Sequence, residues 1–391
     1  MNQNGLRKNS QAVLLSADIG NIPKSIISGM IQNINAGRIF IKGIIIFLLV
    51  ELVFLSFRPD ISLLNVYALL GIKRERFPTS THAPEDAALD VGNLDAMFAS
   101  HIVSQPKADN EFRVLLLGDS AMWGLLLQPG QTISGQLNAL DLTCGNKKIQ
   151  VYNLSYPRSS ATKDLMILDK AMNYQPDLII WPVTLYTLMP KTRIDHWLIG
   201  QNPDELYSLN ARFHFLPRNL QPESPSDKIL DPQRELFRVL RYQLYSLVQL
   251  ATGVDQIQTT YDNVPTELPS DLKFEGMNPP TVTPQQISID EVQDFYLLAK
   301  NVPVILVNEP IMIAKDVPNS DIYYNFYYPR WVYDQYRQIL GAAATQNDWN
   351  YLDLWDKFSS DYYTNTPLHL NPEGERQLAA MLAPSIQKAC P

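Results

Sequence analysis

Five short apolar runs separated by helical patterns place the strongest constraint on what this sequence can fold into. Each run is too short for an ordinary buried helix but suits a strand that is covered on both faces. Helical patterns lie between them, for example Ile133 to Leu140 behind an N-cap at Thr132, and Trp331 to Ala344 after Pro329. This alternation predicts an α/β fold with a parallel sheet, whose functional loops lie at the carboxyl ends of the strands. The runs are residues 112 to 120, which end in Gly-Asp-Ser, Ile149 to Leu154, Leu178 to Val183, Val302 to Val307 and Asn350 to Leu354.

A long interval separates the third run, which ends at Val183, from the fourth, which begins at Val302. A plain crossover between neighbouring parallel strands does not need so many residues. We therefore expect residues 190 to 296 to form a cap that is inserted into a domain spanning residues 111 to 391.

The segment Ile39 to Phe57 contains 15 strongly apolar residues out of 19. Its length nearly matches the hydrocarbon core of a bilayer, so it predicts a transmembrane helix after an N-terminal tail of residues 1 to 38. A cleaved signal peptide is less consistent with this length and with the missing small-residue cleavage pattern. Residues 58 to 110, interrupted by prolines, then form a connecting region. The flanking basic residues slightly favour a cytoplasmic N-terminus, which predicts a single-pass protein of the cell membrane with its soluble domain on the extracytoplasmic side.

Glu51 lies inside this predicted span. Its insertion costs about 3 kcal/mol, which the many Leu, Ile, Phe and Val residues offset at about 0.3 to 0.6 kcal/mol each. One interpretation is a protonated or snorkelling side chain. The other is a polar contact with a helix of another membrane protein, which would then be a partner.

Charge, cysteine content and histidine spacing exclude several classes of function. The chain has 32 basic and 40 acidic side chains, a formal charge of -8, and no basic run, so we expect no nucleic-acid partner. Two cysteines without a CxxC pair cannot build a structural zinc site. We expect neither a metal nor a cofactor, because four of the five histidines are scattered, at His82, His101, His196 and His214.

Ser120 and His369 are the candidates for nucleophilic chemistry. A serine hydroxyl needs a sharp turn that exposes it, a base that takes its proton, and dipoles that stabilise the developing oxyanion. Ser120 follows an apolar strand in the sequence GDSAMWG, and His369 lies in PLHLNPEGERQLA, after the fifth strand and before a helical stretch. Gly-Asp-Ser alone is a common turn sequence, so it is the pairing with His369 that indicates catalysis.

Together, these two motifs resemble those of the SGNH/GDSL hydrolase family over residues 112 to 385. VYNLSYPRSSATKDL, residues 151 to 165, is similar to the second block of that family, and PDLIIWPVTLYT, residues 176 to 187, is similar to the third. The resemblance implies a flavodoxin-like three-layer fold with five parallel strands. It also implies that Ser120 attacks an ester carbonyl and that His369 acts as general base.

The sequence departs from the family at the residue that orients the histidine. The family has Asp three residues before the histidine, whereas this chain has Thr366. Asp361, Asn365 or a backbone carbonyl are the alternatives. Without an orienting group the imidazole tautomer is poorly fixed, which in triad enzymes costs several orders of magnitude in turnover.

The predicted oxyanion hole departs from the family as well. Besides Ser120 itself, the second block offers Ser159 and Ser160 where the family has a glycine, and a backbone amide there needs no glycine. The third block offers Thr184 and Thr187 where the family has an Asn, and a threonine hydroxyl reaches less far. Losing one such donor typically costs about 3 kcal/mol, so weakened catalysis is physically plausible.

Several other polar residues near the predicted catalytic edge have both a structural and a functional interpretation. Asp119 is better explained as a turn-stabilising residue than as an acid catalyst. Glu309 has a helix-capping or loop role, or it contacts substrate. Asn153 braces the nucleophile loop or is a buried structural amide. The aromatic run from Tyr323 to Trp331 packs in the core or stacks on a carbohydrate.

Cys144 and Cys390 follow the first helix after Ser120 and end the last helix, and these two helices are neighbours on one face of the fold that the resemblance implies. A disulfide between them is expected if the domain lies outside the membrane. The alternative is two independent buried thiols.

Three functions remain open. The leading hypothesis is a membrane-anchored serine esterase or acyl transferase that acts on acyl esters of cell-surface glycans or lipids. The second is a catalytically degraded protein of the same fold, serving as a structural or accessory subunit of a membrane complex. The third is a partner of a membrane-bound acyltransferase, in which Ser120 passes on an acyl group.

Overall fold

The computed structural model describes residues 36–57, 66–79, 92–214, 237, 243–253, 256 and 267–391. The chain divides into two compact units, Met1–Pro59 and Asp60–Pro391. The first unit contains helix α2 (Ala36–Phe57), which covers the segment predicted to cross the membrane. Among the described residues we find no helix that has both the length and the apolar character needed to cross a bilayer. The membrane span is therefore not supported here, and the predicted tail up to residue 35 lies outside the described residues.

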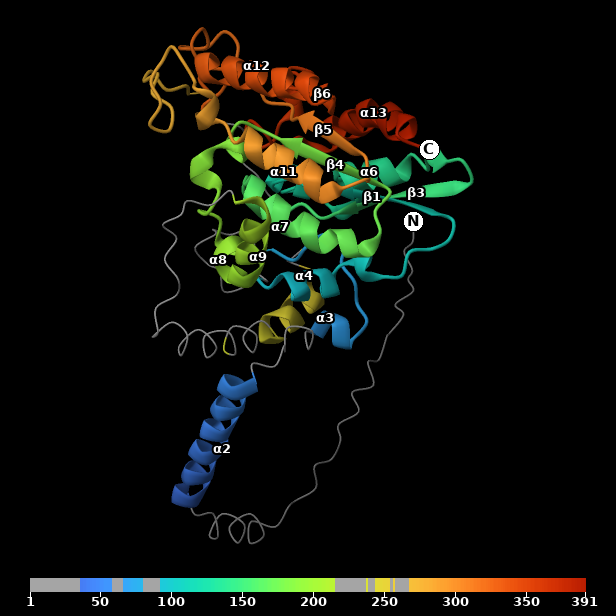
Figure 1. The fold of residues 1–391 in the computed structure, drawn as a ribbon, viewed down its shortest axis with the longest axis vertical. Coiled ribbons are helices and arrows are strands. Elements are labelled where there is room, and N and C mark those ends of the chain that lie inside the picture. Colours follow the sequence, from blue (N-terminus) through green and yellow to red (C-terminus); the bar gives the residue numbers. More distant parts are fainter. Residues whose placement is uncertain are drawn as a thin grey trace, which may run out of the picture. The chain divides into compact units, whose positions relative to one another are not determined.

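The second unit is built around a six-stranded sheet with the order β2-β3-β1-β4-β5-β6 (Figure 1). The five longer strands run parallel to one another. They coincide with the five apolar runs of the sequence, and β1, β4 and β5 are buried at every position. These strands are β1 (Glu111–Leu116), β3 (Lys147–Asn153), β4 (Leu178–Val183), β5 (Val304–Asn308) and β6 (Asn350–Asp353).

The sixth strand, β2 (Thr143–Cys144), makes the sheet mixed, so the prediction of a purely parallel five-stranded sheet is wrong. β2 pairs antiparallel with β3, Thr143 opposite Lys148 and Cys144 opposite Lys147. Gly145 between them has a φ of 61°, which lets the chain return at once. Two residues are too few to show any periodicity, so the sequence carried no sign of this strand.

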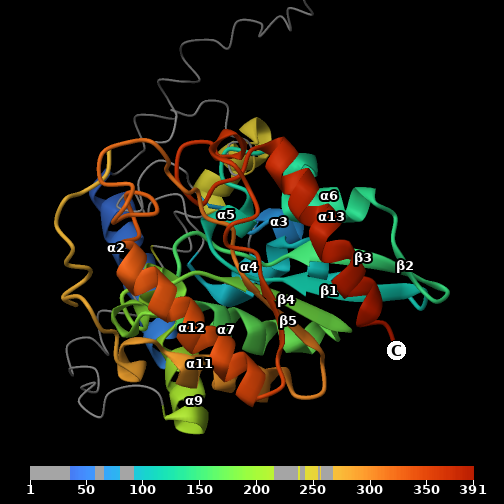
Figure 2. The same ribbon diagram turned by 90° about the horizontal axis from the view of Figure 1, so that it is seen from above.

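Two pairs of helices cover the two faces of the sheet (Figures 1 and 2). α6 packs against α13, and α7 packs against α11. The crossover from β1 to β3 runs along the sheet in the opposite direction to the crossovers from β3 to β4 and from β4 to β5. Right-handed crossovers therefore place α6 on one face and both α7 and α11 on the other, and α13 joins the first face by packing against α6. The helices of this unit are α3 (Val66–Leu69), α4 (Leu94–Ser100), α5 (Ser120–Trp123), α6 (Ile133–Ala139), α7 (Ala161–Ala171), α8 (Trp197–Gln201), α9 (Pro203–Phe213), α11 (Ile289–Ala299), α12 (Arg330–Gln346) and α13 (Pro372–Lys388).

The described parts of the predicted connecting region pack into the same core. Phe77 and Phe98 are buried, with ring centroids 5.2 Å apart. The buried guanidinium of Arg76 donates hydrogen bonds to the carbonyls of Trp123 (3.1 Å) and Gly124 (2.8 Å), at the end of α5. Residues upstream of β1 therefore hold the short helix that begins with Ser120.

The predicted insertion from residue 190 to residue 296 is described in part, and it includes α8, α9 and most of α11. Phe295 of α11 stacks on Trp181 of β4 with ring centroids 3.7 Å apart. The end of the predicted insertion therefore belongs to a helix that covers the sheet. The domain boundaries proposed from the sequence stay predictions.

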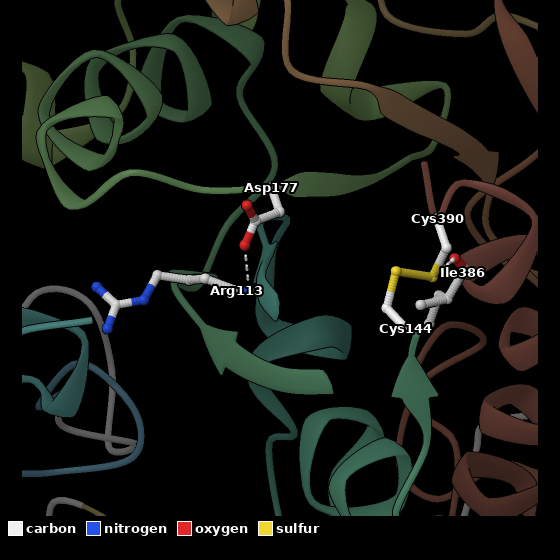
Figure 3. Close-up of a disulfide and its surroundings, with 5 residues drawn as sticks. All are labelled: Arg113, Cys144, Asp177, Ile386 and Cys390. Carbon is white, nitrogen blue, oxygen red and sulfur yellow. Dashed lines mark hydrogen bonds between the residues drawn. A yellow bond between two sulfur atoms is a disulfide. The ribbon is translucent and has the colours of Figure 1, made fainter. Parts of the chain in front are cut away.

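A disulfide joins Cys144 of β2 to Cys390, just after α13 (Figure 3). The Cα atoms of the two residues are 5.5 Å apart. The bond forms where α6, which precedes β2, packs against α13. The predicted disulfide is confirmed, and it ties the edge of the sheet to the C-terminal end of the chain.

Candidate active site

The loop after β1 presents Ser120 at the first position of α5. The side chain of Asp119 caps this helix by accepting a hydrogen bond from the amide of Ala121 (2.9 Å). Gly118 has a φ of 133°, and a Cβ added there would lie 2.7 Å from the side chain of Met122. A residue with a side chain would therefore be strained at position 118. The loop is specified locally, which explains why the Gly-Asp-Ser motif was informative.

His369 lies in a tight loop between β6 and α13. The amide of Thr364 donates to the carbonyl of His369 (2.8 Å), and the hydroxyl of Thr366 accepts from the amide of His369 (3.2 Å). Asn371 caps α13 by accepting from the amides of Glu373 and Gly374. These backbone contacts fix the direction in which the imidazole leaves the chain.

The structure brings the side chains of Ser120, His369 and Asn365 into one hydrogen-bonded row. The Oγ of Ser120 lies 2.9 Å from Nε2 of His369, and the Oδ1 of Asn365 lies 2.8 Å from Nδ1 of the same ring. Because the amide oxygen can only accept, Nδ1 carries the proton and Nε2 is free to accept from Ser120. The row has the order nucleophile, base and orienting group.

Burial lowers the pKa of His369 to about 4, against the opposing effect of the Asp119 carboxylate. His369 is 6% exposed, whereas Ser120 is only partly buried. The imidazole is therefore neutral, and able to accept a proton, from weakly acidic pH upward.

Asp361, the other side chain considered as an orienting group, and Thr366, which stands where the family has Asp, do not hydrogen-bond to the ring. Asp361 is exposed, and its backbone carbonyl accepts a hydrogen bond from the side chain of Asn371 (2.9 Å). Thr366 holds the backbone of the loop instead of the ring. Of the alternatives that the sequence left open, only Asn365 contacts the imidazole.

The hydroxyls of Ser159 and Ser160 have structural partners. Ser159 donates to the carboxylate of Asp119 (2.5 Å), which joins the second block to the nucleophile loop. Ser160 is buried, caps α7 and donates to the carbonyl of Thr192 (2.9 Å). Neither hydroxyl is available as an oxyanion donor, so the second block can contribute only backbone amides.

Thr184 and Thr187 are buried and do not line the cavity. The hydroxyl of Thr187 accepts a hydrogen bond from the amide of Thr184 (3.1 Å), and neither side chain lines the cavity beside Ser120. The two threonines therefore do not supply the donor that the resemblance implied, although Tyr186 of the same block lines the cavity.

Of the other residues noted in the sequence, Asn153 and Glu309 are buried and do not line the cavity. Asn153 donates from its side chain to the carbonyl of Met122 (2.8 Å) and so braces α5. Glu309 is buried outside the cavity, and neither carboxylate oxygen has a hydrogen-bond partner in the described part of the chain. Tyr327 lines the cavity, whereas Tyr328 is buried in the core.

A cavity of about 480 Å³ opens beside Ser120 and His369. Its walls carry aromatic rings and both signs of charge, which suits an ester whose groups are partly polar. Among the lining residues are Tyr186, Trp197, Tyr327, Arg158, Lys191 and Asp195. Within the described residues no group of three or more His, Cys, Asp or Glu side chains is placed to hold a metal ion.

Two residues that support this site, Lys163 and His196, were not indicated by the sequence. Lys163 of α7 is fully buried, although nothing in the local sequence distinguishes it from a surface lysine. His196 was grouped with the scattered histidines and is buried as well. A buried cation is not visible in a local pattern, because its partners are backbone carbonyls of other loops.

Comparisons with known proteins find no matching family model and no matching curated protein. Solved structures do resemble the chain. A carbohydrate acetylesterase family member from Sinorhizobium meliloti has a TM-score of 0.34 and 12% identity, over 71% of this chain and 98% of that chain. The aryl esterase of M. smegmatis has a TM-score of 0.32 and 14% identity, over 71% of this chain and 99% of that chain. A lipolytic protein of the G-D-S-L family from Veillonella parvula has a TM-score of 0.34 and 10% identity, over 69% of this chain and 95% of that chain.

These neighbours are esterases and G-D-S-L proteins, the kind of protein that the sequence resembles. At such low TM-scores and identities the likeness supports no conclusion about function. A conclusion about function must therefore come from the geometry around Ser120.

Proposed function

We propose that the protein is a serine esterase or acyl transferase. The observation that carries the proposal is the row of Ser120, His369 and Asn365, with Oγ and Nε2 2.9 Å apart at the wall of a cavity. A hydroxyl held against a neutral imidazole, with the far nitrogen occupied by an acceptor, is the arrangement that nucleophilic acyl transfer needs.

In the first half of the reaction, Oγ of Ser120 attacks the ester carbonyl carbon while its proton passes to Nε2 of His369. The carbonyl electron pair moves onto oxygen, and backbone amides beside the nucleophile stabilise the resulting oxyanion. The pair then returns, the carbon–oxygen bond to the leaving alcohol breaks, and that alcohol takes the proton from Nε2.

In the second half, the acyl group on Ser120 is attacked by water or by an acceptor hydroxyl. His369 takes the proton of the attacking group, and Ser120 regains it when the acyl–Oγ bond breaks. Attack by water makes the protein an esterase, and attack by another alcohol makes it an acyl transferase.

Our proposal extends to the location and the substrate class. We infer that the segment Ile39 to Phe57 attaches the protein to the cell membrane, because 15 of its 19 residues are strongly apolar. The disulfide favours the extracytoplasmic side, because such bonds persist in oxidising compartments. A domain held there would meet acyl esters of cell-surface glycans or lipids. A membrane partner contacted through Glu51 belongs to the same proposal.

The test is labelling by a fluorophosphonate probe, which reacts with an activated serine. We expect the purified full chain to label, and the label to disappear in Ser120→Ala and His369→Ala. Ser208→Ala, which changes an exposed serine of α9, is the control and should label normally. A folded wild-type protein that never labels would contradict the enzymatic proposal.

The alternative is a catalytically degraded protein that serves as an accessory subunit of a membrane complex. One observation favours it, namely that Thr184 and Thr187 of the third block supply no donor to the cavity, since both are buried and neither lines it. The same labelling experiment separates the two, because an accessory subunit needs no activated serine.

A further inference from the structure

The ammonium group of Lys163 is buried beneath the candidate active site and joins two of its loops. Lys163 is 0% exposed, and its Nζ donates to the carbonyls of Gly118 (2.7 Å), Tyr156 (2.7 Å) and Arg158 (3.0 Å). Gly118 belongs to the nucleophile loop, and the other two belong to the second block. An ion pair with Asp164, at 3.0 Å, compensates the buried charge.

His196 holds the carbonyl of Pro157, which lies between Tyr156 and Arg158 in the chain. Its Nδ1 accepts from the amide of Leu198 (3.1 Å), so Nε2 carries the proton and donates to the carbonyl of Pro157 (2.8 Å). Burial lowers the pKa of His196 to about 3, which keeps the ring in this neutral form. Three consecutive carbonyls, from Tyr156 to Arg158, are therefore all held by buried side chains.

The backbone N–H groups that follow these carbonyls must then point away from Lys163 and His196. In a trans peptide the C=O of one residue and the N–H of the next are antiparallel. Since Lys163 holds the carbonyl of Arg158, the N–H of Ser159 points away from Lys163, and Ser159 lines the cavity. Arg158, at a φ of 68°, makes this turn possible.

The same geometry applies to the nucleophile. The carbonyl of Asp119 accepts from the amide of Trp123 (2.8 Å), so the N–H of Ser120 points out of the N-terminal end of α5. The two loops that carry the amides of Ser120 and Ser159 also contact each other directly, because the amide of Tyr156 donates to the carbonyl of Gly118 (3.0 Å).

We propose that Lys163 is a positioning residue for the oxyanion hole, which fixes the amides of Ser120 and Ser159 relative to each other by holding the carbonyls of both loops. His196 assists on the second loop. This inference rests on the proposed function, because an oxyanion forms only if Ser120 attacks an acyl carbon. It explains how a second block without glycine, and a third block whose two threonines do not line the cavity, can still serve a tetrahedral intermediate.

The test compares Lys163→Met with a matched control on the full chain. Arg113→Met is that control, because Arg113 is also buried and also holds loop carbonyls, those of Val103 (3.2 Å) and Tyr174 (3.0 Å). Arg113 is part of β1, whose opposite end leads to the nucleophile loop. Both variants are expected to lower the melting temperature, so stability alone does not decide.

The deciding readouts are the hydrolysis kinetics of an aryl ester and the affinity for a boronic acid, which mimics the tetrahedral intermediate on Ser120. For Lys163→Met we expect kcat to fall roughly 100-fold with KM changed less than about threefold, because the amides act on the transition state and not on bound ester. Boronate affinity should fall by a similar factor. Arg113→Met should keep both kcat and boronate affinity.

Lys163→Arg, which keeps a cationic donor, should recover part of kcat. Should Lys163→Met fail to fold, His196→Gln gives the second measurement, with a smaller loss of kcat and boronate affinity expected. A folded Lys163→Met with unchanged kcat and boronate affinity, or an unchanged His196→Gln where the Met variant does not fold, overturns the inference. If wild-type protein neither hydrolyses the ester nor labels with fluorophosphonate, the proposed function itself has failed, which is a different outcome.

Discussion

Asn365 decides the acid–base behaviour of the site at the scale of single residues. Its amide oxygen fixes the tautomer of His369, as a carboxylate would. It carries no charge, however, and so cannot stabilise the imidazolium that forms when Ser120 gives up its proton. Burial lowers the pKa of His369 to about 4, and the charge of Asp119 opposes this shift only in part.

We therefore expect the acid limb of kcat/KM to lie near pH 4, since the base must be neutral. Asn365→Asp places a negative charge beside the ring, raises the pKa of His369, and should move the acid limb up by about one pH unit or more. Asn365→Leu removes the acceptor and should lower kcat by roughly 10²- to 10⁴-fold. A pH–rate profile for each variant measures both effects.

Asp361→Asn serves as the control, because that side chain is exposed and does not touch the ring. It should leave the profile unchanged. If Asn365→Asp also left the acid limb in place, the contact between Asn365 and His369 would not exist in solution.

The sequence indicated Ser120 and His369, because each lies in a motif of neighbouring residues. It could not choose between Asp361 and Asn365, because the choice depends on how a short loop folds back between Tyr363 and Leu370. Lys163 was missed for a similar reason. Its partners lie on two other loops, and one of those, at Gly118, is 45 positions away in the chain.

At the scale of elements, the carboxyl end of β5 contains a buried acid. Glu309 follows the strand and is 1% exposed, and its two carboxylate oxygens have no partner in the described part of the chain. Burial raises the pKa of this carboxyl well above 4.5, and the charges of Asp119, Asp164 and Glu375 add to the effect. Lys163 opposes it. The folded protein therefore keeps a proton on Glu309 that the unfolded chain releases.

This sign makes the stability contribution of Glu309 largest at low pH, and it is lost as the pH rises above the unfolded value of about 4.5. Glu309→Gln mimics the protonated form and removes the dependence. We expect its unfolding free energy, relative to wild type, to increase between pH 5 and pH 8 by on the order of 1 kcal/mol per pH unit. Urea denaturation at the two pH values measures the difference.

Glu373→Gln is the control, because Glu373 is exposed and its pKa is lowered to about 2 by hydrogen bonds from Arg376 and Gln377. Its effect on stability should not vary between pH 5 and pH 8. A Glu309→Gln difference that stays flat over this range would show that Glu309 is ionised in the folded protein.

The long strands of the sheet could be predicted because buried parallel strands appear as continuous apolar runs. β2 could not, because it consists of only two residues and exists through its pairing with β3. Residues 58 to 110 were predicted to be a connecting region because prolines recur between Pro59 and Pro106. The aromatic rings in the described parts of this region are buried, and their packing depends on contacts with the core of the sheet that a local pattern does not show.

At the scale of the whole molecule, the disulfide between Cys144 and Cys390 spans 246 positions. In the chain-entropy picture, closing so long a loop stabilises the folded state by up to about 5 kcal/mol. We expect the double variant Cys144→Ser with Cys390→Ser to lose a large part of this in denaturant unfolding. Its activity at 25 °C should persist, because neither cysteine lines the cavity.

Mass spectrometry of the unreduced protein checks the bond itself. A peptide pair joined through the two cysteines is the expected result. Alkylation of both thiols without prior reduction would contradict the bond, and it would remove the support that the bond gives to an extracytoplasmic location.

The bond between Cys144 and Cys390 also closes the chain into a covalent ring that contains His369 but not Ser120. A protease that cuts once between residues 145 and 368 therefore opens the ring without releasing a fragment. The piece with the base stays attached to the piece with the nucleophile, and the nicked protein runs as two bands on a gel only after reduction.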